Sequence, residues 1–127
     1  MFLIDAYAWI EYFRGSKKGK KVAEIVDDSK TEILTLESTL AEIKGWALRE
    51  GERFDELYFV IRHDSRIVHS TLEEWLRAAE LRFEIKKKKP RFGMMDALLI
   101  AAKEKYKCMI LTGDPHFESI KDVLFID

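Results

Sequence analysis

Short apolar runs recur along the chain and predict the strands of one sheet. They are rich in β-branched and large aliphatic residues, and longer stretches with a different period separate them. We expect strands at 2–4, 32–36, 66–68, 108–112 and 123–126.

The stretches between these runs carry apolar residues at helical spacing. The clearest stripe joins Leu36, Leu40, Ile43 and Ala47 and ends at Gly51. Strands that alternate with helices imply crossover connections. We therefore predict an α/β fold, a three-layer α/β/α sandwich around a mostly parallel sheet of four to five strands. The expected helices are 6–14, 17–28, 36–51, 52–62, 72–87 and 94–106.

The stretch 72–87 combines an apolar stripe with a basic end. A lysine run at its end suits the negative pole of a helix dipole. The apolar positions are Leu72, Trp75, Leu76, Ala79 and Phe83.

Length and composition narrow the class of protein. The chain of 127 residues predicts a single domain over 1–127, and its net charge of −1 gives no global attraction for nucleic acid. Cys108 is the only cysteine, so neither an internal disulfide nor a cysteine-rich zinc site can form. Asp5 and Glu11 interrupt the apolar N-terminus, which therefore does not resemble a signal peptide, and no run suits a membrane helix. We expect a cytoplasmic protein without membrane contact.

Four acids fall at the same edge of the predicted sheet. Asp5 follows the first strand, Asp114 follows the fourth, and Glu42 lies in the first turns of the helix that leaves the second. Asp96 starts the helix that leads back to the fourth strand, and this helix must begin at the same edge. In open parallel sheets, ligands bind at the carboxyl ends of the strands.

Each acid also has a purely structural interpretation. Asp5 and Asp114 are suitable N-caps, Glu42 has the spacing of a capping box with Thr39, and Asp96 suits a helix N-terminus. Four carboxylates at one edge nevertheless repel each other, and no lysine or arginine immediately flanks any of them. Carboxylates select Mg²⁺ or Mn²⁺, which activate water and stabilise charge in phosphoryl displacement. We therefore expect one or two such ions and phosphodiester hydrolysis.

The same residues carry a resemblance to a known family. FLIDAYAWIEYFRG, LTLESTLAEI, MMDALLIAA and ILTGDPHF resemble, in this order, the PIN-domain ribonucleases and especially the VapC-type toxins of toxin–antitoxin pairs. The resemblance covers essentially the whole chain. It implies that Asp5, Glu42, Asp96 and Asp114 are catalytic metal ligands, with Thr112 supporting them.

The resemblance also carries expectations about activity and partners. It implies a Mg²⁺- or Mn²⁺-dependent endoribonuclease that cleaves single-stranded RNA and leaves a 5′-phosphate, a homodimer, and inhibition by a small antitoxin protein. Two departures stand out. Ala6 and Tyr7 replace the serine or threonine usual after the first acid, and Pro115–His116 replaces polar residues after Asp114.

Basic residues near the predicted site are candidate RNA contacts, although a charge run is also typical of a solvated helix end. Alternatives for the whole chain are a housekeeping RNA-processing nuclease and a PIN-like module that only binds partners. A phosphorylation-receiver domain would need an acidic pair after the first strand, where Asp5 is alone. The candidate RNA contacts are Arg14, Lys88, Lys89, Arg91 and His116.

Overall fold

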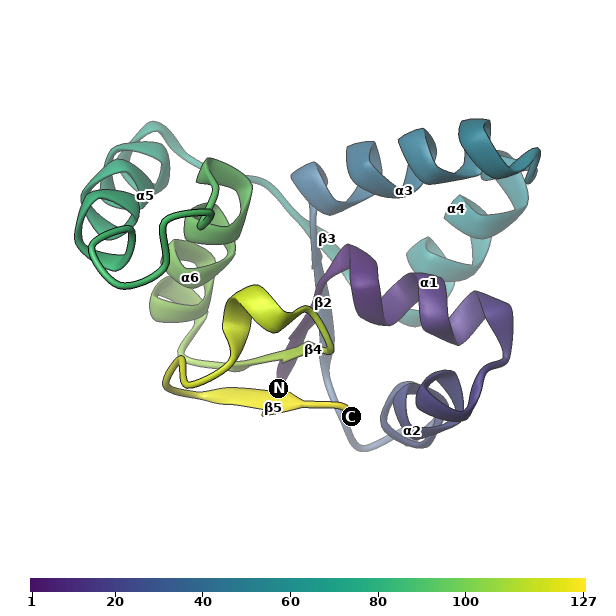
Figure 1. The fold of residues 1–127 in the computed structure, drawn as a ribbon. Coiled ribbons are helices and arrows are strands. Elements are labelled where there is room, and N and C mark those ends of the chain that lie inside the picture. Colours follow the sequence, from purple (N-terminus) through teal and green to yellow (C-terminus); the bar gives the residue numbers. More distant parts are fainter.

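Five strands form one fully parallel sheet in the computed structural model, which describes residues 1–127 (Figure 1). Their order across the sheet is β3-β2-β1-β4-β5, and each neighbouring pair is parallel. From β1 the chain adds β2 and β3 on one side of the sheet, and then β4 and β5 on the other side. The switch point of the sheet therefore lies between the neighbouring strands β1 and β4. The strands are β1 (Phe2–Ile4), β2 (Ile33–Leu36), β3 (Arg66–Val68), β4 (Met109–Thr112) and β5 (Val123–Phe125).

Helices cover both faces of the sheet and produce the predicted three layers (Figure 1). On one face lie α1 (Ala6–Arg14), α2 (Lys17–Val26), α3 (Glu37–Glu50) and α4 (Phe54–Asp64). On the other lie α5 (Leu72–Ile85) and α6 (Met94–Tyr106), and a 3₁₀ turn, η1 (Pro115–Phe117), follows β4. The predicted fold class is confirmed. No helix of the chain has the length and apolarity needed to cross a bilayer.

Adjacent residues of the central strands pack into different cores. Leu3 and Ile110 belong to the cluster under α5 and α6, whereas Ile4 and Leu111 belong to the cluster that contains Trp9 of α1. All five side chains are fully buried. The alternation follows from the two-residue period of a strand, and it fixes β1 and β4 firmly between the helical layers.

The predicted elements are all present, with small shifts at their ends. The second helix stops at Val26 and not at residue 28, because Asp28 accepts hydrogen bonds from the backbone N–H of Lys30 and the hydroxyl of Thr31, which favour a turn. The fourth strand begins one residue after Cys108, which follows the left-handed backbone of Lys107. The fifth helix ends at Ile85, before the lysine run.

The apolar stripe of α5 faces solvent and not the core. Leu72, Leu76 and Phe83 are 74%, 61% and 68% exposed. The opposite side of the helix packs against α6 through Ala78 and through Glu74, whose carboxylate binds the Lys105 ammonium at 2.9 Å. An amphipathic stripe ordinarily faces a core. Here only one side of α5 has a helix or sheet beside it, so the chain leaves this stripe without a partner.

Candidate active site

The switch between β1 and β4 brings two of the predicted acids to one place. Asp5 directly follows β1, and Asp114 lies two residues after the end of β4. The two strands are paired with Leu3 opposite Ile110 and Ile4 opposite Leu111, so Asp5 lies beside Thr112. A crevice at such a switch point is the usual ligand site of open parallel sheets.

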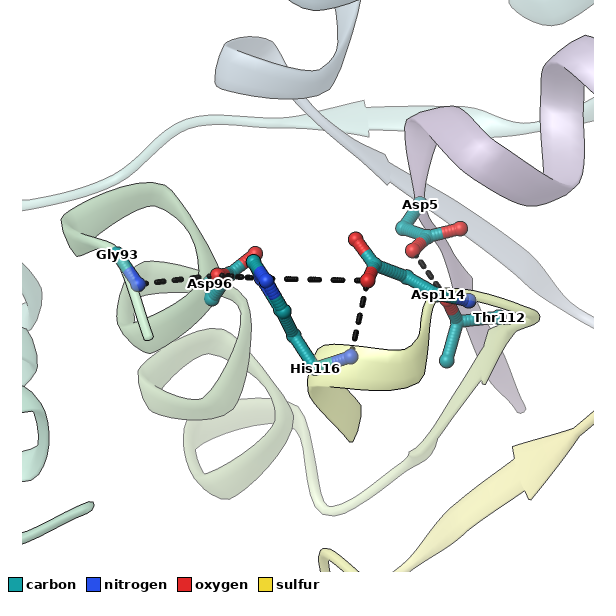
Figure 2. Close-up of polar contacts among 6 residues, drawn as sticks. All are labelled: Asp5, Gly93, Asp96, Thr112, Asp114 and His116. Atoms are coloured by element: carbon teal, nitrogen blue, oxygen red, sulfur yellow. Dashed lines mark hydrogen bonds and ion pairs between the residues drawn. The ribbon is translucent and has the colours of Figure 1, made fainter. Parts of the chain in front are cut away.

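Asp5 is buried and held by two hydrogen bonds. Its Oδ1 accepts the backbone N–H of Ala8 at 2.9 Å, which caps α1, and its Oδ2 accepts the hydroxyl of Thr112 (Figure 2). The pKa of Asp5 is raised to about 7, chiefly by burial and to a smaller extent by the charges of Asp114 and Glu42, although the hydrogen bonds from Thr112 and Ala8 lower it. Asp5 is therefore the N-cap of α1, as one interpretation of the sequence predicted. Its ionised form is nevertheless destabilised by burial, so that it is only partly ionised near neutral pH.

Thr112 donates the hydroxyl hydrogen bond to Asp5 that a serine or threonine at position 6 or 7 was expected to make. The Thr112 oxygen donates to Asp5 and accepts the backbone N–H of Asp114 at 2.9 Å, so it links the two acids. Tyr7 does not contact Asp5 in this way. The Tyr7 hydroxyl accepts a hydrogen bond from Lys18 Nζ at 3.0 Å, and its ring packs against Gly113. A Cβ at Gly113 would lie 2.4 Å from Tyr7 Cε1, so glycine is required between Thr112 and Asp114.

Asp96 and Asp114 form a compact cluster with His116. The Nδ1 atom of His116 lies 2.9 Å from Asp96 Oδ2 and 3.9 Å from Asp114 Oδ1, and ligand atoms of all three side chains lie within 4.8 Å of one another (Figure 2). Asp96 Oδ2 also accepts the backbone N–H of Gly93 at 3.0 Å, and Asp114 Oδ1 accepts that of His116 at 2.9 Å. The second oxygen of each carboxylate has no partner in the chain.

Glu42 is more exposed than Asp5 and lies in the second turn of α3. The pKa of Glu42 is raised by partial desolvation and by the negative charges of Asp96 and Asp114, which shows that the three carboxylates share one field. The capping box that its spacing suggested is absent. The helix begins at Glu37, so Thr39 lies inside it, and its hydroxyl is buried without a hydrogen-bond partner.

The candidate active site therefore consists of an open cluster of metal-binding side chains and a buried acid behind it. Asp96, Asp114 and His116 form an open cluster, with free carboxylate oxygens, while Asp5 behind it is tied to Thr112 and Glu42 borders it. Two carboxylates, free on one oxygen each, fit a hard divalent cation, and the imidazole nitrogen makes the set as suitable for Mn²⁺ as for Mg²⁺. Such a cation would relieve the mutual repulsion that, in addition to desolvation, raises the pKa values of Asp5 and Glu42.

Of the predicted RNA contacts, His116 belongs to this cluster, whereas the lysines and arginines do not. Arg14, at the end of α1, is engaged with Trp46, whose ring centre lies 5.7 Å from the guanidinium carbon, and with Glu11. Lys88, Lys89 and Arg91 lie between α5 and α6, in the segment that leads into the Asp96 helix, and they form no ion pair. Their role as RNA contacts stays a prediction.

His116 is the residue whose position the sequence described least well. The sequence shows that His116 lies two residues after Asp114. Its contact with Asp96, however, depends on how α6 packs beside η1. The Pro115–His116 pair is therefore part of the site.

Together, the fold and the acidic cluster define a small α/β protein with a candidate metal site at the sheet's switch point. The PIN domain family model matches residues 2–123, and the chain belongs to this family. No curated protein matches the chain in sequence.

Solved structures with the same fold include three from bacteria. A toxin–antitoxin complex from Klebsiella pneumoniae matches with a TM-score of 0.78 and 18% identity, covering 98% of this chain and 96% of that chain. VapC20 from Mycobacterium tuberculosis, a sarcin-ricin loop cleaving toxin, matches with a TM-score of 0.79 and 17% identity, covering 100% of both chains. VapBC2 from Rickettsia felis, bound to a DNA fragment from its promoter, matches with a TM-score of 0.76 and 14% identity, covering 99% of this chain and 98% of that chain.

Proposed function

We propose that this chain is a Mg²⁺- or Mn²⁺-dependent endoribonuclease of the VapC type that cleaves single-stranded RNA. The observation that carries the proposal is the convergence of Asp96, Asp114 and His116 beside Asp5, at the switch point of a PIN-domain sheet. The similarity in fold to VapC20, described as a sarcin-ricin loop cleaving toxin, supports RNA as the substrate.

In the proposed nuclease, three acids would bind the cation or border it, and one hydroxyl would position a fourth acid. Asp96 and Asp114 would bind the cation through their free oxygens, and Glu42 would complete the acidic border at the solvent side. Thr112 holds the Asp5 carboxylate in one orientation toward Asp114. The bound cation would lower the pKa of a water molecule and stabilise negative charge on the phosphate during in-line displacement.

The direct test is a cleavage assay with labelled single-stranded RNA. We expect cleavage in Mg²⁺ or Mn²⁺, products that carry a 5′-phosphate, and complete loss of cleavage in EDTA with recovery when Mn²⁺ is restored. Cleavage that persists unchanged in EDTA would contradict a metal mechanism. An absence of cleavage in either metal, with a folded protein, would contradict the nuclease proposal itself.

The basic segment before α6 is proposed as a phosphate contact. Lys88 and Lys89 carry positive charge close to the Asp96 helix and are not neutralised by an ion pair. Replacing both by alanine should weaken RNA binding about equally for all sequences and reduce the slope of log K against log salt by about 1.4, since a single-stranded phosphate contact contributes about 0.7. Binding measured at several salt concentrations checks this, and an unchanged slope would place these lysines outside the RNA contact.

A small antitoxin protein is proposed as the natural partner. One of the structures with this fold is a toxin–antitoxin complex, and another, VapBC2, is bound to a DNA fragment from its promoter. An antitoxin would explain how a cell tolerates an RNA-cleaving protein.

A second copy of the chain is proposed to cover the apolar stripe of α5. The stripe of Leu72, Leu76 and Phe83 is exposed, and the helix has the exposed acid Glu73 in its first turn, with the lysine run following its end. Two such helices packed antiparallel about a twofold axis would bury both stripes and place acidic starts beside basic ends. The surface is therefore complementary to itself.

The homodimer is tested by Leu76→Lys. Because every residue of a twofold interface counts twice, the loss of two buried leucines should raise the dimer dissociation constant by more than about a hundredfold. Sedimentation measures this directly. The matched control is Leu48→Lys, which changes a similarly exposed leucine on α3, outside the stripe. A monomeric wild type, or a dimer that Leu76→Lys leaves intact, would contradict this interface.

A further inference from the structure

A groove between α3 and the opposite helical layer opens beside the acidic cluster. Ser38, Ala41 and Gly45 of α3 form its floor, while Trp75 of α5 and Met95 of α6 form its other wall. Its volume is about 710 Å³, in the range of small-molecule sites. The residues that α3 contributes at Ser38, Ala41 and Gly45 are small, which leaves space on this side of the groove.

The groove is continuous with the candidate active site. Glu42, which shares the field of Asp96 and Asp114, belongs to the groove lining. Met95 directly precedes Asp96 at the start of α6. A ligand in the groove would therefore extend directly from a phosphate bound at the acidic cluster.

The lining combines an open aromatic surface with an unpaired cation. Trp75 is 37% exposed and Met95 is 39% exposed, so both side chains are accessible to a ligand in the groove. Arg49, in the last turn of α3, lines the groove and forms no salt bridge. An exposed aromatic ring stacks on any nucleobase, and a guanidinium binds phosphate oxygens through two hydrogen bonds. Base stacking and phosphate binding are the contacts that proteins make with single-stranded nucleotides of any sequence.

We propose that this groove binds a nucleotide of the RNA next to the cleaved phosphate, with its base stacked on Trp75 and its flanking phosphate bound by Arg49. The proposal rests on the proposed function, since it assigns the substrate's neighbouring nucleotide to a place beside the same acidic cluster. Trp75 is then a binding residue, and its contribution is separable from the metal chemistry of Asp96 and Asp114.

The test measures RNA binding and tryptophan fluorescence in the Asp96→Asn background, in Mg²⁺, so that the RNA stays intact. The probe is a short single-stranded RNA of mixed sequence. Stacking should quench the Trp75 signal, which is obtained by subtracting the fluorescence of Trp75→Phe, where only the buried Trp9 and the half-buried Trp46 remain. Trp75→Phe should lose the quenching and keep most of the affinity, because phenylalanine still stacks. Trp75→Ala should weaken binding by about fivefold to a hundredfold.

A second variant and a control make the test independent of Trp75 alone. A Cβ at Gly45 meets only Arg49 Nη1, at 3.5 Å, so Gly45→Leu should fold and fill the groove, and it should weaken RNA binding by a comparable factor. Phe59→Ala removes an aromatic that is 60% exposed on α4, outside the groove, and should leave binding unchanged.

The outcomes separate this proposal from the proposed function. If the RNA binds and Trp75→Ala and Gly45→Leu bind it as tightly as the parent, or if quenching persists in Trp75→Phe, the groove proposal is overturned while the nuclease proposal stands. If the wild-type chain neither binds nor cleaves single-stranded RNA, both proposals fall together.

Discussion

Replacing Asp96 by asparagine is expected to reduce RNA cleavage by at least about a hundredfold. Loss of an outer partner of a metal ligand typically costs about 10–100-fold, so loss of a ligand should cost at least the upper part of that range. The asparagine oxygen can still accept the backbone N–H of Gly93, which Asp96 accepts at 3.0 Å, so the start of α6 should be preserved. Initial rates of cleavage with Mn²⁺ measure the effect.

The control for Asp96→Asn is Glu50→Gln, which also removes one negative charge. Glu50 is exposed at the end of α3 and forms no salt bridge, so its replacement should leave the rate unchanged. The removal of one of several repelling carboxylates should also leave the free energy of unfolding of Asp96→Asn equal to or above that of the wild type. An Asp96→Asn variant that retains more than a small fraction of the wild-type rate would exclude Asp96 as a metal ligand.

The pH dependence of stability should show the second large effect. The native state holds the Asp5 proton up to a pH of about 7, whereas the unfolded chain releases it near the ordinary pKa of 3.8. The native state therefore binds more protons between these values, and the free energy of unfolding falls as the pH rises through this window. The contribution of Asp5 is on the order of 4 kcal/mol, lost by about pH 8.

Urea unfolding of the wild type and Asp5→Asn across the range from acidic to mildly basic pH, without metal, isolates this contribution. The variant should gain stability relative to the wild type as the pH rises, because asparagine cannot ionise. Glu42, whose pKa is also raised, contributes in both proteins and cancels from the difference. Mn²⁺ should flatten the pH dependence of the wild type, since a cation favours the ionised acids. A difference between the two proteins that does not change with pH would contradict the raised pKa of Asp5.

The sequence predicted the elements well because their patterns are local. The stripe of Leu36, Ile43 and Ala47 is buried as expected, and the strands at 2–4 and 66–68 begin and end at the predicted residues. The α/β class follows from the alternation of these patterns, because parallel strands need crossover helices. The strand order was not predictable from the same data, since it depends on which edges pair in three dimensions.

The site was predictable in part for the same reason. The placement of Asp5 and Asp114 after two strands, and of Asp96 at a helix start, follows from chain direction. Their division into an open cluster and a buried acid does not follow from it. Thr112 reaches Asp5 only because β1 and β4 pair in one register, and His116 reaches Asp96 only because α6 packs beside η1.

Periodicity and chain direction are properties of short segments, and they were enough to predict the secondary structure, the fold class and the set of acids at one edge of the sheet. Packing in three dimensions sets which acids share a cluster, brings His116 to them, and leaves the apolar side of α5 and the groove at Trp75 open. These features depend on contacts between residues far apart in the chain, and no local pattern specifies where two helices leave a surface uncovered.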